Sequence, residues 1–431
     1  MVKIKNAVFI GWLFIAAGLN AQTLKIDDCY RLAKENFPLV KQYELLEKTK
    51  EFSIENAQKA YLPQFGIYGQ ATYQSDVTKL PFDFSNVPVP GLSDITIPTL
   101  SKDQYRLYGE VSYSLTDLAT TKNQSDLVKA NTEVEKQKLE VELYKLRERI
   151  NSLFFGVLLI DAQIAQAELV KNDNQNGINR AEVAIANGVA LRSAADNLKA
   201  EWLKTKQRTT GLRATRKGYC DMLSLFIGQK IDESTVFDTP QLLKSPLGDL
   251  GVIDRPEMQL FHLQNRAFDL QNRLITNKNL PRLSLFLQGG FGKPALNMFS
   301  NNFDPYYITG VRLSWNLTGY WTFKNEREQI LINQTGTQIQ QETFLFNTNL
   351  TLSQQNAEIA QMQELIADDS EIILLREKVK NAAQTQLENG TATTNDYLIA
   401  VNAEDQARQN RILHEIQLLL AQYNANTTAG N

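Results

Sequence analysis

The sequence predicts a mainly α-helical chain with a membrane β-barrel portion, built from two copies of one pattern of long coiled-coil helical hairpins and strands. The first observation behind this is a duplication. The segment ending at Thr116 resembles the one ending at Thr318, and Asn187-Gly188 recurs as Asn389-Gly390, at one offset of 202 positions (318 minus 116, 389 minus 187). The second is that each copy holds two runs of about ten residues that alternate apolar and polar.

The N-terminus has the pattern of a secretory signal peptide over residues 1–21. Lys3 and Lys5 precede an apolar run of 13 residues, Ala7 to Leu19 (19 minus 7, plus 1), and Leu19-Asn20-Ala21 resembles a cleavage site. A membrane-spanning helix needs about 20 apolar residues, so this run is too short to be an anchor. We expect an exported protein whose mature part contains no transmembrane helix.

Each half of the mature chain begins with a shorter helical segment that prolines interrupt and end. In the first half the prolines are Pro38 and Pro63, and in the second half Pro256 and Pro281 lie 218 positions later (256 minus 38, 281 minus 63). The predicted organisation is a first repeat at 22–228, an irregular link at 229–254, a second repeat at 255–423 and a flexible C-terminus at 424–431.

Four strands are predicted, two in each repeat. Their apolar positions alternate with polar ones, and they run through Phe65, Ile67, Gly69, Ala71, Tyr73; Tyr105, Leu107, Gly109, Val111, Tyr113; Leu283, Leu285, Leu287, Gly289, Phe291; and Tyr307, Thr309, Val311, Leu313, Trp315. Strands of about ten residues with one apolar face are typical of membrane barrels, although a soluble sandwich has the same alternation. The loop from Gln74 to Gln104, rich in proline, is expected to face outward.

Four strands in one chain are too few to close a barrel. Each backbone group left unpaired at a sheet edge in lipid costs several kcal/mol, so an open sheet is unstable in a membrane. A membrane barrel therefore requires several copies of this chain.

The longest predicted helix in each repeat spans 71 positions between the landmarks (187 minus 116). In the first copy, apolar residues recur at steps of four and three, as Leu139, Leu143, Leu146, Ile150, Leu153, Val157, Ile160 and Ile164. The second copy keeps one line of this seam at steps of seven, as Leu345, Leu352, Ile359, Ile366 and Ile373. This heptad spacing predicts coiled-coil packing, and such a helix is roughly 105 Å long. Polar positions such as Gln354, Gln355, Asn356 and Gln363 suit a water-filled lumen.

Composition points to no enzyme, cofactor or metal site. The formal charge of -3 is nearly balanced, so no nucleic-acid partner is indicated, and Cys29 and Cys220 lack metal-site spacing. A disulfide between these two cysteines is a minor alternative in an oxidising compartment. His262 and His414 have no ligand or nucleophile partner at useful spacing, so we interpret them as surface or interface residues.

The residues resemble the TolC-like outer-membrane efflux proteins over nearly the whole mature chain. The resemblance rests on Leu24 to Ala33 with Phe37-Pro38, on Leu62-Pro63 and Leu280-Pro281 before the strands, on Arg255-Pro256-Glu257, and on the two Asn-Gly turns. It implies a homotrimer with a twelve-stranded outer-membrane barrel continued by an α-helical tunnel in the periplasm. It also implies a periplasmic adaptor protein at the hairpin tips, which connects the channel to an inner-membrane pump or a secretion ATPase.

The adaptor contacts that the resemblance implies lie at the two tips. The residues are Asn187, Gly188, Val189, Asn389, Gly390 and Thr391, for which simple helix capping is an alternative that can also hold together with adaptor contact. Gly390 to Asp396 matches the family's tip motif, and Gly188 to Asp196 matches it with two extra residues. Asp396 is a candidate for an acidic ring at the aperture, or else an N-cap. Ile399 replaces a second acidic position of the family pattern, which argues against a double ring.

Two further sets of residues belong to the predicted barrel. Arg106, Glu110 and Arg312 lie on the polar face and would line the lumen, whereas Tyr105, Tyr113, Tyr307 and Trp315 suit an aromatic belt at the membrane interface. Ordinary core packing is the alternative for the aromatic residues.

These patterns together predict a passive outer-membrane exit duct that conducts drugs, metal ions or proteins, classes that the sequence does not separate. The alternatives are a periplasmic coiled-coil adaptor or scaffold and an exported enzyme. Duplicated strands with apolar faces argue against a scaffold, and the absence of a clustered polar site in the sequence argues against an enzyme.

Overall fold

The structure is a computed structural model that describes residues 23–78, 99–242 and 253–431. The expected signal peptide at 1–21, most of the 74–104 loop and part of the 229–254 link therefore lie outside the described residues. The chain divides into two compact units, each made of matching parts of both repeats. We call residues 41–141 and 255–346 the sheet unit, and residues 1–40, 142–254 and 347–431 the hairpin unit.

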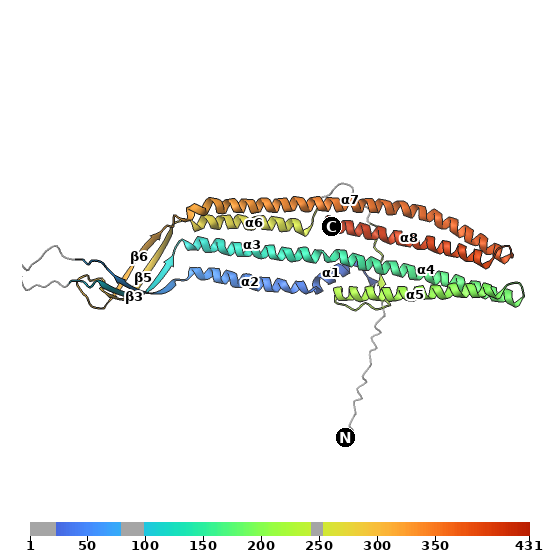
Figure 1. The fold of residues 1–431 in the computed structure, drawn as a ribbon, viewed down its shortest axis with the longest axis horizontal. Coiled ribbons are helices and arrows are strands. Elements are labelled where there is room, and N and C mark those ends of the chain that lie inside the picture. The colour runs from blue at the N-terminus through green and yellow to red at the C-terminus, as the bar shows by residue number, and fades with distance from the viewer. Residues whose placement is uncertain (1–22, 79–98, 243–252) are drawn as a thin grey trace, which may run out of the picture. The chain divides into compact units, whose positions relative to one another are not determined.

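The sheet unit contains the four predicted strands in one antiparallel sheet. These are β2 (Gln64–Tyr73), β3 (Asp103–Ser114), β5 (Arg282–Lys293) and β6 (Asp304–Ser314), in the order β2-β3-β5-β6. The sheet is open, with β2 and β6 as its edges (Figure 1). The four-strand prediction is confirmed.

The register places all the predicted apolar positions on one face. Val111 pairs with Phe65 and with Leu287, and Leu287 pairs with Thr309, so apolar positions meet across all three pairings. We call this side the apolar face and the opposite side, which carries Glu110 and Arg312, the polar face. The apolar face is open to solvent in the single chain: Ile67 is 85% and Leu313 71% exposed.

Four helical segments of the sheet unit adjoin the strands: α2 (Lys41–Gln58), α3 (Asp117–Tyr144), α6 (Pro256–Lys278) and the first part of α7 (Gly319–Glu388). A short helix, η2 (Lys59–Tyr61), joins α2 to β2. Three contacts fix the helix order as α2-α3-α6-α7: Tyr43 donates to Glu140, Ala130 packs on Ala267, and Phe261 packs on Phe344. The helices thus follow the order of the strands they adjoin.

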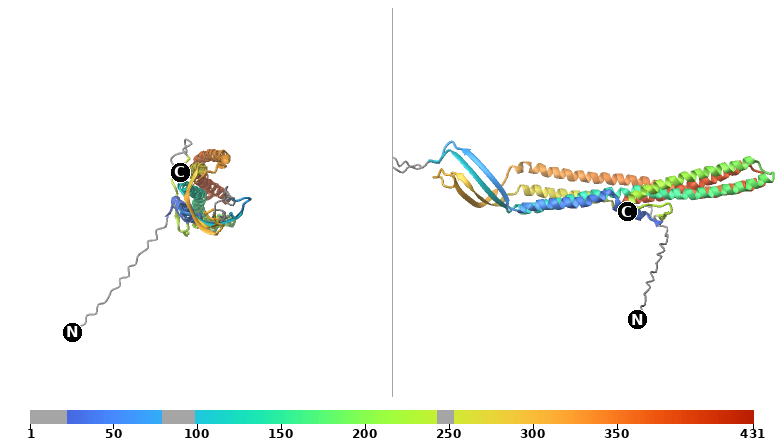
Figure 2. Two further views of the ribbon diagram at one scale, coloured as in Figure 1. Left: turned by 90° about the vertical axis from the view of Figure 1, so that its left-hand side faces the viewer. Right: turned by 90° about the horizontal axis from the view of Figure 1, so that it is seen from below.

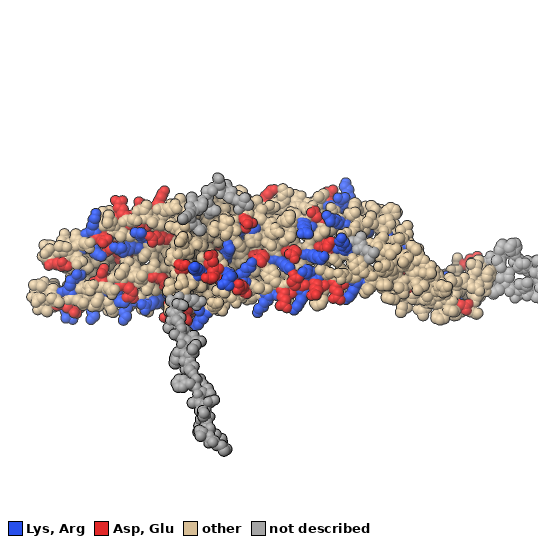
Figure 3. Space-filling view, turned by 180° about the vertical axis from the view of Figure 1, so that it is seen from behind, with Lys and Arg blue, Asp and Glu red and all other residues tan. Residues whose placement is uncertain are grey.

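Charged side chains cover the helices of the sheet unit but are sparse over its strands, as Figure 3 shows for one side of the molecule. Charge is costly to place in lipid and cheap in water. The distribution therefore separates a part of this unit suited to a membrane from a part suited to an aqueous compartment.

The hairpin unit consists of two long helical hairpins side by side (Figures 1 and 2). One is α4 (Leu146–Ala186) with α5 (Arg192–Ile227), and the other is the rest of α7 with α8 (Thr394–Ala429). α1 (Ile26–Asn36), η1 (Pro38–Val40) and the small parallel pair of β1 (Thr23–Leu24) and β4 (Val236–Phe237) complete this unit.

The heptad seams form the core of the hairpins, as predicted. Leu146, Ile150, Val157 and Ile160 of α4 are buried, and Leu352 and Ile359 of α7 pack against Leu418 of α8. The second long helix is continuous over 70 residues. The first is likewise helical over Thr120–Ala186, because Lys145, between α3 and α4, keeps helical angles of φ -61 and ψ -17.

The C-terminus corrects one expectation, because residues 424–429 are helical rather than flexible. α8 continues to Ala429, and Ala425 and Ala429 are buried. The physical reason is a buried polar cluster: Asn151, fully buried on α4, donates to Asn424 at 2.9 Å and accepts from Tyr30. The polar composition that suggested fraying instead satisfies a buried partner.

One described helical stretch, Thr120–Ala186, is long and apolar enough to pass a composition test for a membrane span, a test that core helices of folded proteins also pass. Its largest apolar side chains are covered by protein: Phe154 packs on Phe237 and Phe155 on Tyr423, each at 5.2 Å between ring centroids. This burial agrees with the expected role in a core.

Candidate functional site: hairpin tips, inter-hairpin network and polar sheet face

The first hairpin turns at Asn187, Gly188 and Val189. Gly188 has φ +75, and the Gly188 and Val189 amides donate to the carbonyls of Ile185 and Ala184 at 3.0 and 2.9 Å. These two bonds form a Schellman motif, which requires a left-handed residue after the helix. A Cβ on Gly188 would meet nothing within 4 Å, so the glycine serves backbone conformation rather than space.

The second hairpin repeats this turn at Asn389, Gly390 and Thr391. Gly390 has φ +72, and the Gly390 and Thr391 amides donate to Leu387 and Gln386 at 3.1 and 2.9 Å. The capping alternative is therefore correct for both tips. Contact with an adaptor stays a prediction, for which the exposed side chain of Val189, at 78%, is available.

Asp396 is the third residue of α8 rather than its N-cap. The N-cap is Thr393, and the two residues form a capping box: Thr393 Oγ1 accepts the Asp396 amide at 3.2 Å, and the Thr393 amide donates to Asp396 Oδ2 at 2.9 Å. The hydrogen bonds from the Thr393 side chain and backbone lower the pKa of Asp396. The carboxylate is exposed and stays charged, as an aperture ring would need.

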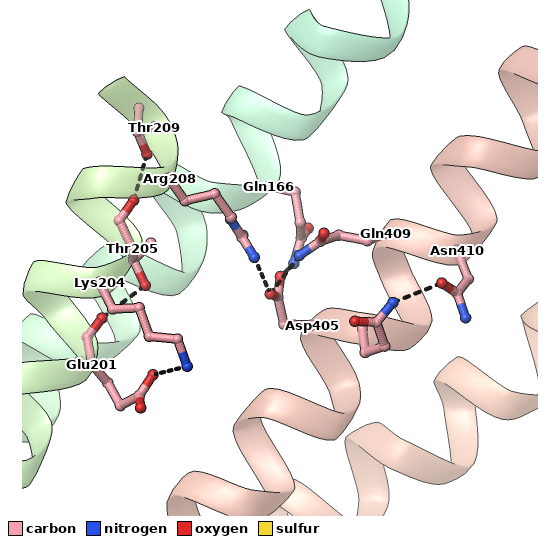
Figure 4. A network of polar contacts seen from close by, with 10 residues as sticks. Gln166, Glu201, Lys204, Thr205, Arg208, Thr209, Asp405, Gln409 and Asn410 are labelled. Carbon is pink, nitrogen blue, oxygen red and sulfur yellow. Dashed lines mark hydrogen bonds and ion pairs between the residues drawn. The ribbon is translucent and has the colours of Figure 1, made fainter. Parts of the chain in front are cut away.

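The two hairpins are tied together by a buried polar network that the sequence analysis did not identify (Figure 4). Asp405 of α8 is 8% exposed and accepts from Gln166 of α4 at 3.1 Å and from Arg208 of α5 at 3.0 Å. Gln409, one turn further along α8, donates to the same carboxylate at 2.6 Å. One acid thus joins three helices of both hairpins.

The preceding acid, Glu404, ties α8 to α7. Its carboxylate lies 2.6 Å from Lys380 Nζ and 2.7 Å from the guanidinium of Arg408, and Lys380 also lies 3.8 Å from Asp173 of α4. Burial alone raises the pKa of Glu404, but the hydrogen bonds from Lys380 and Arg408 outweigh it, so the pKa is lowered. Nearer the tips, Arg180 lies 3.8 Å from Glu388 and again joins the hairpins.

A sequence signal for this network existed. Leu398 and Val401 are buried at a spacing of three, and Asp405 follows at a spacing of four, so an acid occupies the next position of an apolar seam. The partners on α4 and α5 were not predictable, because their identity depends on which helices pack together.

His414 lies at the interface between α8 and α7, where its Nδ1 lies 2.7 Å from Oδ2 of Asp369, 45 residues away in the sequence. His262 is exposed on α6, as expected. Among the described residues, no group of three or more His, Cys, Asp or Glu could hold a metal ion.

The two cysteines are buried and free. Burial, with a smaller contribution from Asp28 and Asp27, raises the pKa of the Cys29 thiol to about 12, and burial raises the pKa of Cys220. Both thiols are therefore protonated and unreactive at neutral pH, and the minor disulfide alternative is not observed.

The polar sheet face brings two of its three predicted residues together. Arg312 donates to both carboxylate oxygens of Glu110, at 2.8 and 3.2 Å, and its guanidinium lies 4.5 Å from the ring centroid of Phe286. Gln288 donates to the same carboxylate. Arg106 lies on this face too, but it makes no ion pair with another described residue.

The predicted belt residues lie at different levels of the sheet. Tyr113 ends β3 near the helices and Trp315 follows β6 there, donating from Nε1 to the Asn279 carbonyl at 3.1 Å. Tyr105 lies at the opposite end of β3, and Tyr307 lies between these levels. Tyr307, Trp315 and Tyr105 are exposed, at 75%, 53% and 44%.

A scan of the sequence against protein-family models finds no match, and a search of the curated proteins finds none either. Solved structures do match, at low sequence identity. The outer-membrane protein VceC of Vibrio cholerae is 13% identical with a TM-score of 0.63, covering 94% of this chain and 96% of that one. CusC, described as forming a transmembrane channel, is 13% identical with a TM-score of 0.66 and coverages of 97% and 95%.

The outer-membrane channel CmeC of Campylobacter jejuni is 12% identical with a TM-score of 0.60, and the match covers 100% of this chain and 94% of that one. The described residues therefore have the fold of these outer-membrane channels. The resemblance seen in the sequence is confirmed at the level of the fold.

Proposed function

We propose that the protein is a TolC-like outer-membrane channel, a passive exit duct with its helical part in the periplasm. The observation that carries this is the exposed apolar face on a four-stranded sheet with two unpaired edges. In water this face would be an aggregation hazard, whereas in a bilayer it is the surface that lipid requires.

The edges of the sheet unit support closure by further copies of the chain. The strand edges are β2 and β6, and the helices continuous with them, α2 and α7, are the edges of the helical layer. Each edge helix has large exposed apolar side chains seven residues apart, Leu45 and Phe52 on α2 and Ile332, Ile339 and Phe346 on α7. Pairing β6 with β2 of the next copy would bring these two stripes together as a coiled-coil seam.

The homotrimer with a twelve-stranded barrel follows from this closure and from the likeness to the channels. Purified protein should migrate as a trimer without heating and as a monomer after heating, fractionate with the outer membrane, and conduct ions in planar bilayers. Ile339→Glu should weaken the trimer, while the adjacent Gln340→Glu adds the same charge outside the stripe and should not. A monomer that is soluble without detergent would disprove the proposal and favour the periplasmic scaffold.

The tips and the network behind them suggest how the duct opens. Asp405, and Lys380 beside Asp173, join the two hairpins in this conformation. We propose that an adaptor bound at Asn187 to Val189 and Asn389 to Thr391 shifts the helices to a second packing. Energy would come from an inner-membrane pump or a secretion ATPase through that adaptor. Crosslinking from Val189→Cys to a co-expressed adaptor tests this contact, with the exposed Leu225→Cys, far along α5, as its control.

The polar face would line the barrel lumen, with Arg106, Glu110 and Arg312 facing water, and Tyr105, Tyr113, Tyr307 and Trp315 would contact the lipid interface. A substrate class does not follow from these residues. Drugs, metal ions and proteins all fit a passive duct, and identification of the adaptor and pump that copurify with the channel would separate them.

A further inference from the structure

The apolar face has a hollow at its centre. Gly109 of β3 and Gly289 of β5 lie directly opposite each other in the register, and the same row continues to Ile67 of β2 and Tyr307 of β6. Because neither central residue has a side chain, the row forms a trough that crosses the two inner strands.

The walls of the trough are apolar on both sides. Leu107 and Phe291 occupy the neighbouring row on one side, and Phe65, Val111 and Leu287 the row on the other. Ile67, at 85% exposed, and Tyr307, at 75%, stand at its two ends. Neighbouring rows on one face are about 7 Å apart, so the two walls are about 14 Å apart between backbones, and the space left between their side chains is suited to a chain of methylene groups.

Folding does not require glycine at either position. A Cβ on Gly289 would meet nothing within 4 Å, and a Cβ on Gly109 would come no closer than 3.9 Å to any atom. The next residue gives the contrast: a Cβ on Gly290 would lie 2.2 Å from the Leu107 carbonyl oxygen, so that glycine is needed for space. Glycine in the interior of a strand lowers the stability of that strand. Because neither Gly109 nor Gly289 is needed for folding, we attribute these two glycines to a ligand that occupies the trough from outside.

We propose that the trough binds an acyl chain of an outer-membrane lipid, one for each copy of the protein. The inference rests on the proposed function, because only in a barrel does the apolar face meet lipid. The lining offers dispersion contacts and no hydrogen-bond donor in its floor, which suits a hydrocarbon chain. Lys293 and Asp103, at the rim of this face, carry opposite charges on adjacent strands and offer no net charge to an anionic headgroup, so the apolar floor and walls carry the recognition of the acyl chain.

The test fills the trough without changing the lumen. Gly109→Leu with Gly289→Leu places two side chains in the floor, whereas the control, Ala71→Leu, adds apolar volume on the same face outside the trough. Trimers purified in mild detergent are incubated with palmitoyl-oleoyl phosphatidylethanolamine, and bound lipid is counted by native mass spectrometry. The wild type and the control should retain lipid at one per chain, and the filled variant should lose it several-fold.

Equal retention by the filled variant and the wild type, or no retained lipid in wild-type trimers, overturns the inference. A wild-type dimer of trimers that the filled variant loses would show instead that a second copy occupies the trough. Heat-modifiable migration of each variant on gels shows whether the trimer assembles, and this tests the proposed function separately from lipid binding. A channel that assembles and conducts but retains no lipid contradicts only the acyl-chain proposal.

Discussion

Glu110 and Arg312 form a bidentate ion pair across β5, the strand that lies between theirs, and they are 202 positions apart in the sequence. That separation is the repeat offset (312 minus 110), so the two residues occupy equivalent positions in the two repeats. The same repeat position thus lies on β3 in the first copy and on β6 in the second, and it holds an acid in one copy and a base in the other. Equivalent positions of the two repeats therefore provide both partners of this ion pair, which joins β3 to β6.

The ion pair predicts different stabilities for a variant that loses one of the two charges and for a variant in which the two charges are exchanged. Glu110→Gln leaves Arg312 without its acid. Hydrogen bonds to charged groups contribute about 1.5–3 kcal/mol, and because the Arg312 side chain is 44% exposed and screened by water, we expect the assembly to lose about 1 kcal/mol of stability. Glu110→Arg combined with Arg312→Glu restores both charges in exchanged positions. The temperature at which the trimer dissociates on gels should fall in the single variant and recover in the exchanged one; no recovery would mean that the pair is not what fastens the strands.

Asp405 predicts a link between stability and closure of the hairpins. Asp405→Ala leaves the Arg208 guanidinium partly buried without its acid, and loss of one partner from a buried pair costs about 3 kcal/mol. If this network holds the closed packing, the variant should also raise the resting conductance in planar bilayers. The control, Glu415→Gln, removes an exposed partner of Arg411 on the same helix, a pair worth about 0.5 kcal/mol or less. Unchanged conductance in Asp405→Ala would limit the network to a structural role.

Asp396 and Thr393 allow capping to be separated from ion selectivity. Thr393→Ala removes the N-cap but keeps the carboxylate, whereas Asp396→Asn keeps an amide at this position and removes the charge. Loss of the cap should cost about 1 kcal/mol. If three copies of Asp396 form a ring, the reversal potential in a KCl gradient should shift toward anions in Asp396→Asn and stay unchanged in Thr393→Ala. Equal reversal potentials would leave Asp396 with capping alone.

The capping box also predicts how the stability of the N-terminus of α8 changes with pH. The pKa of Asp396 is lowered in the folded protein, so its contribution to stability is present above the unfolded-state pKa and is lost as pH falls through the folded value. Helicity at the tip, followed by circular dichroism below about pH 4, where an ordinary Asp titrates, should therefore decrease less steeply in Asp396→Asn than in the wild type. An identical acid profile in both would contradict the assignment.

The regular features of this fold were accessible from sequence because they repeat. The alternation of apolar and polar residues predicts the strands and their faces, and the heptad spacing predicts the buried side of α4 and α7. The two Asn-Gly pairs predict the turns at Gly188 and Gly390. Each is a local pattern with its own physical period. The contacts of Asp405 were not accessible, because Gln166 and Arg208 reach it from helices far apart in sequence.

The failed expectation at the end of α8 has a related cause. Asn424, Asn426 and Thr427 are polar, and their composition alone predicts a frayed terminus. In the folded protein, Asn151 donates to Asn424, and Tyr144 donates to the Thr427 carbonyl at 2.8 Å, so contacts with α3 and α4 hold these residues in α8.

Asn151 provides the corresponding test. Its side chain is fully buried and bonded to Tyr30 and Asn424, so Asn151→Ala removes a partner from two half-buried polar groups, at a cost of about 1 kcal/mol for each lost hydrogen bond. Asn172→Ala changes an exposed asparagine of the same helix and should cost about 0.5 kcal/mol or less. Hydrogen exchange should report the loss as faster exchange at residues 424–429 in Asn151→Ala and not in Asn172→Ala. If these residues exchanged as fast in the wild type as in Asn151→Ala, the C-terminal turn would be frayed after all, because an ordered helix end protects its amides only while its partners hold it.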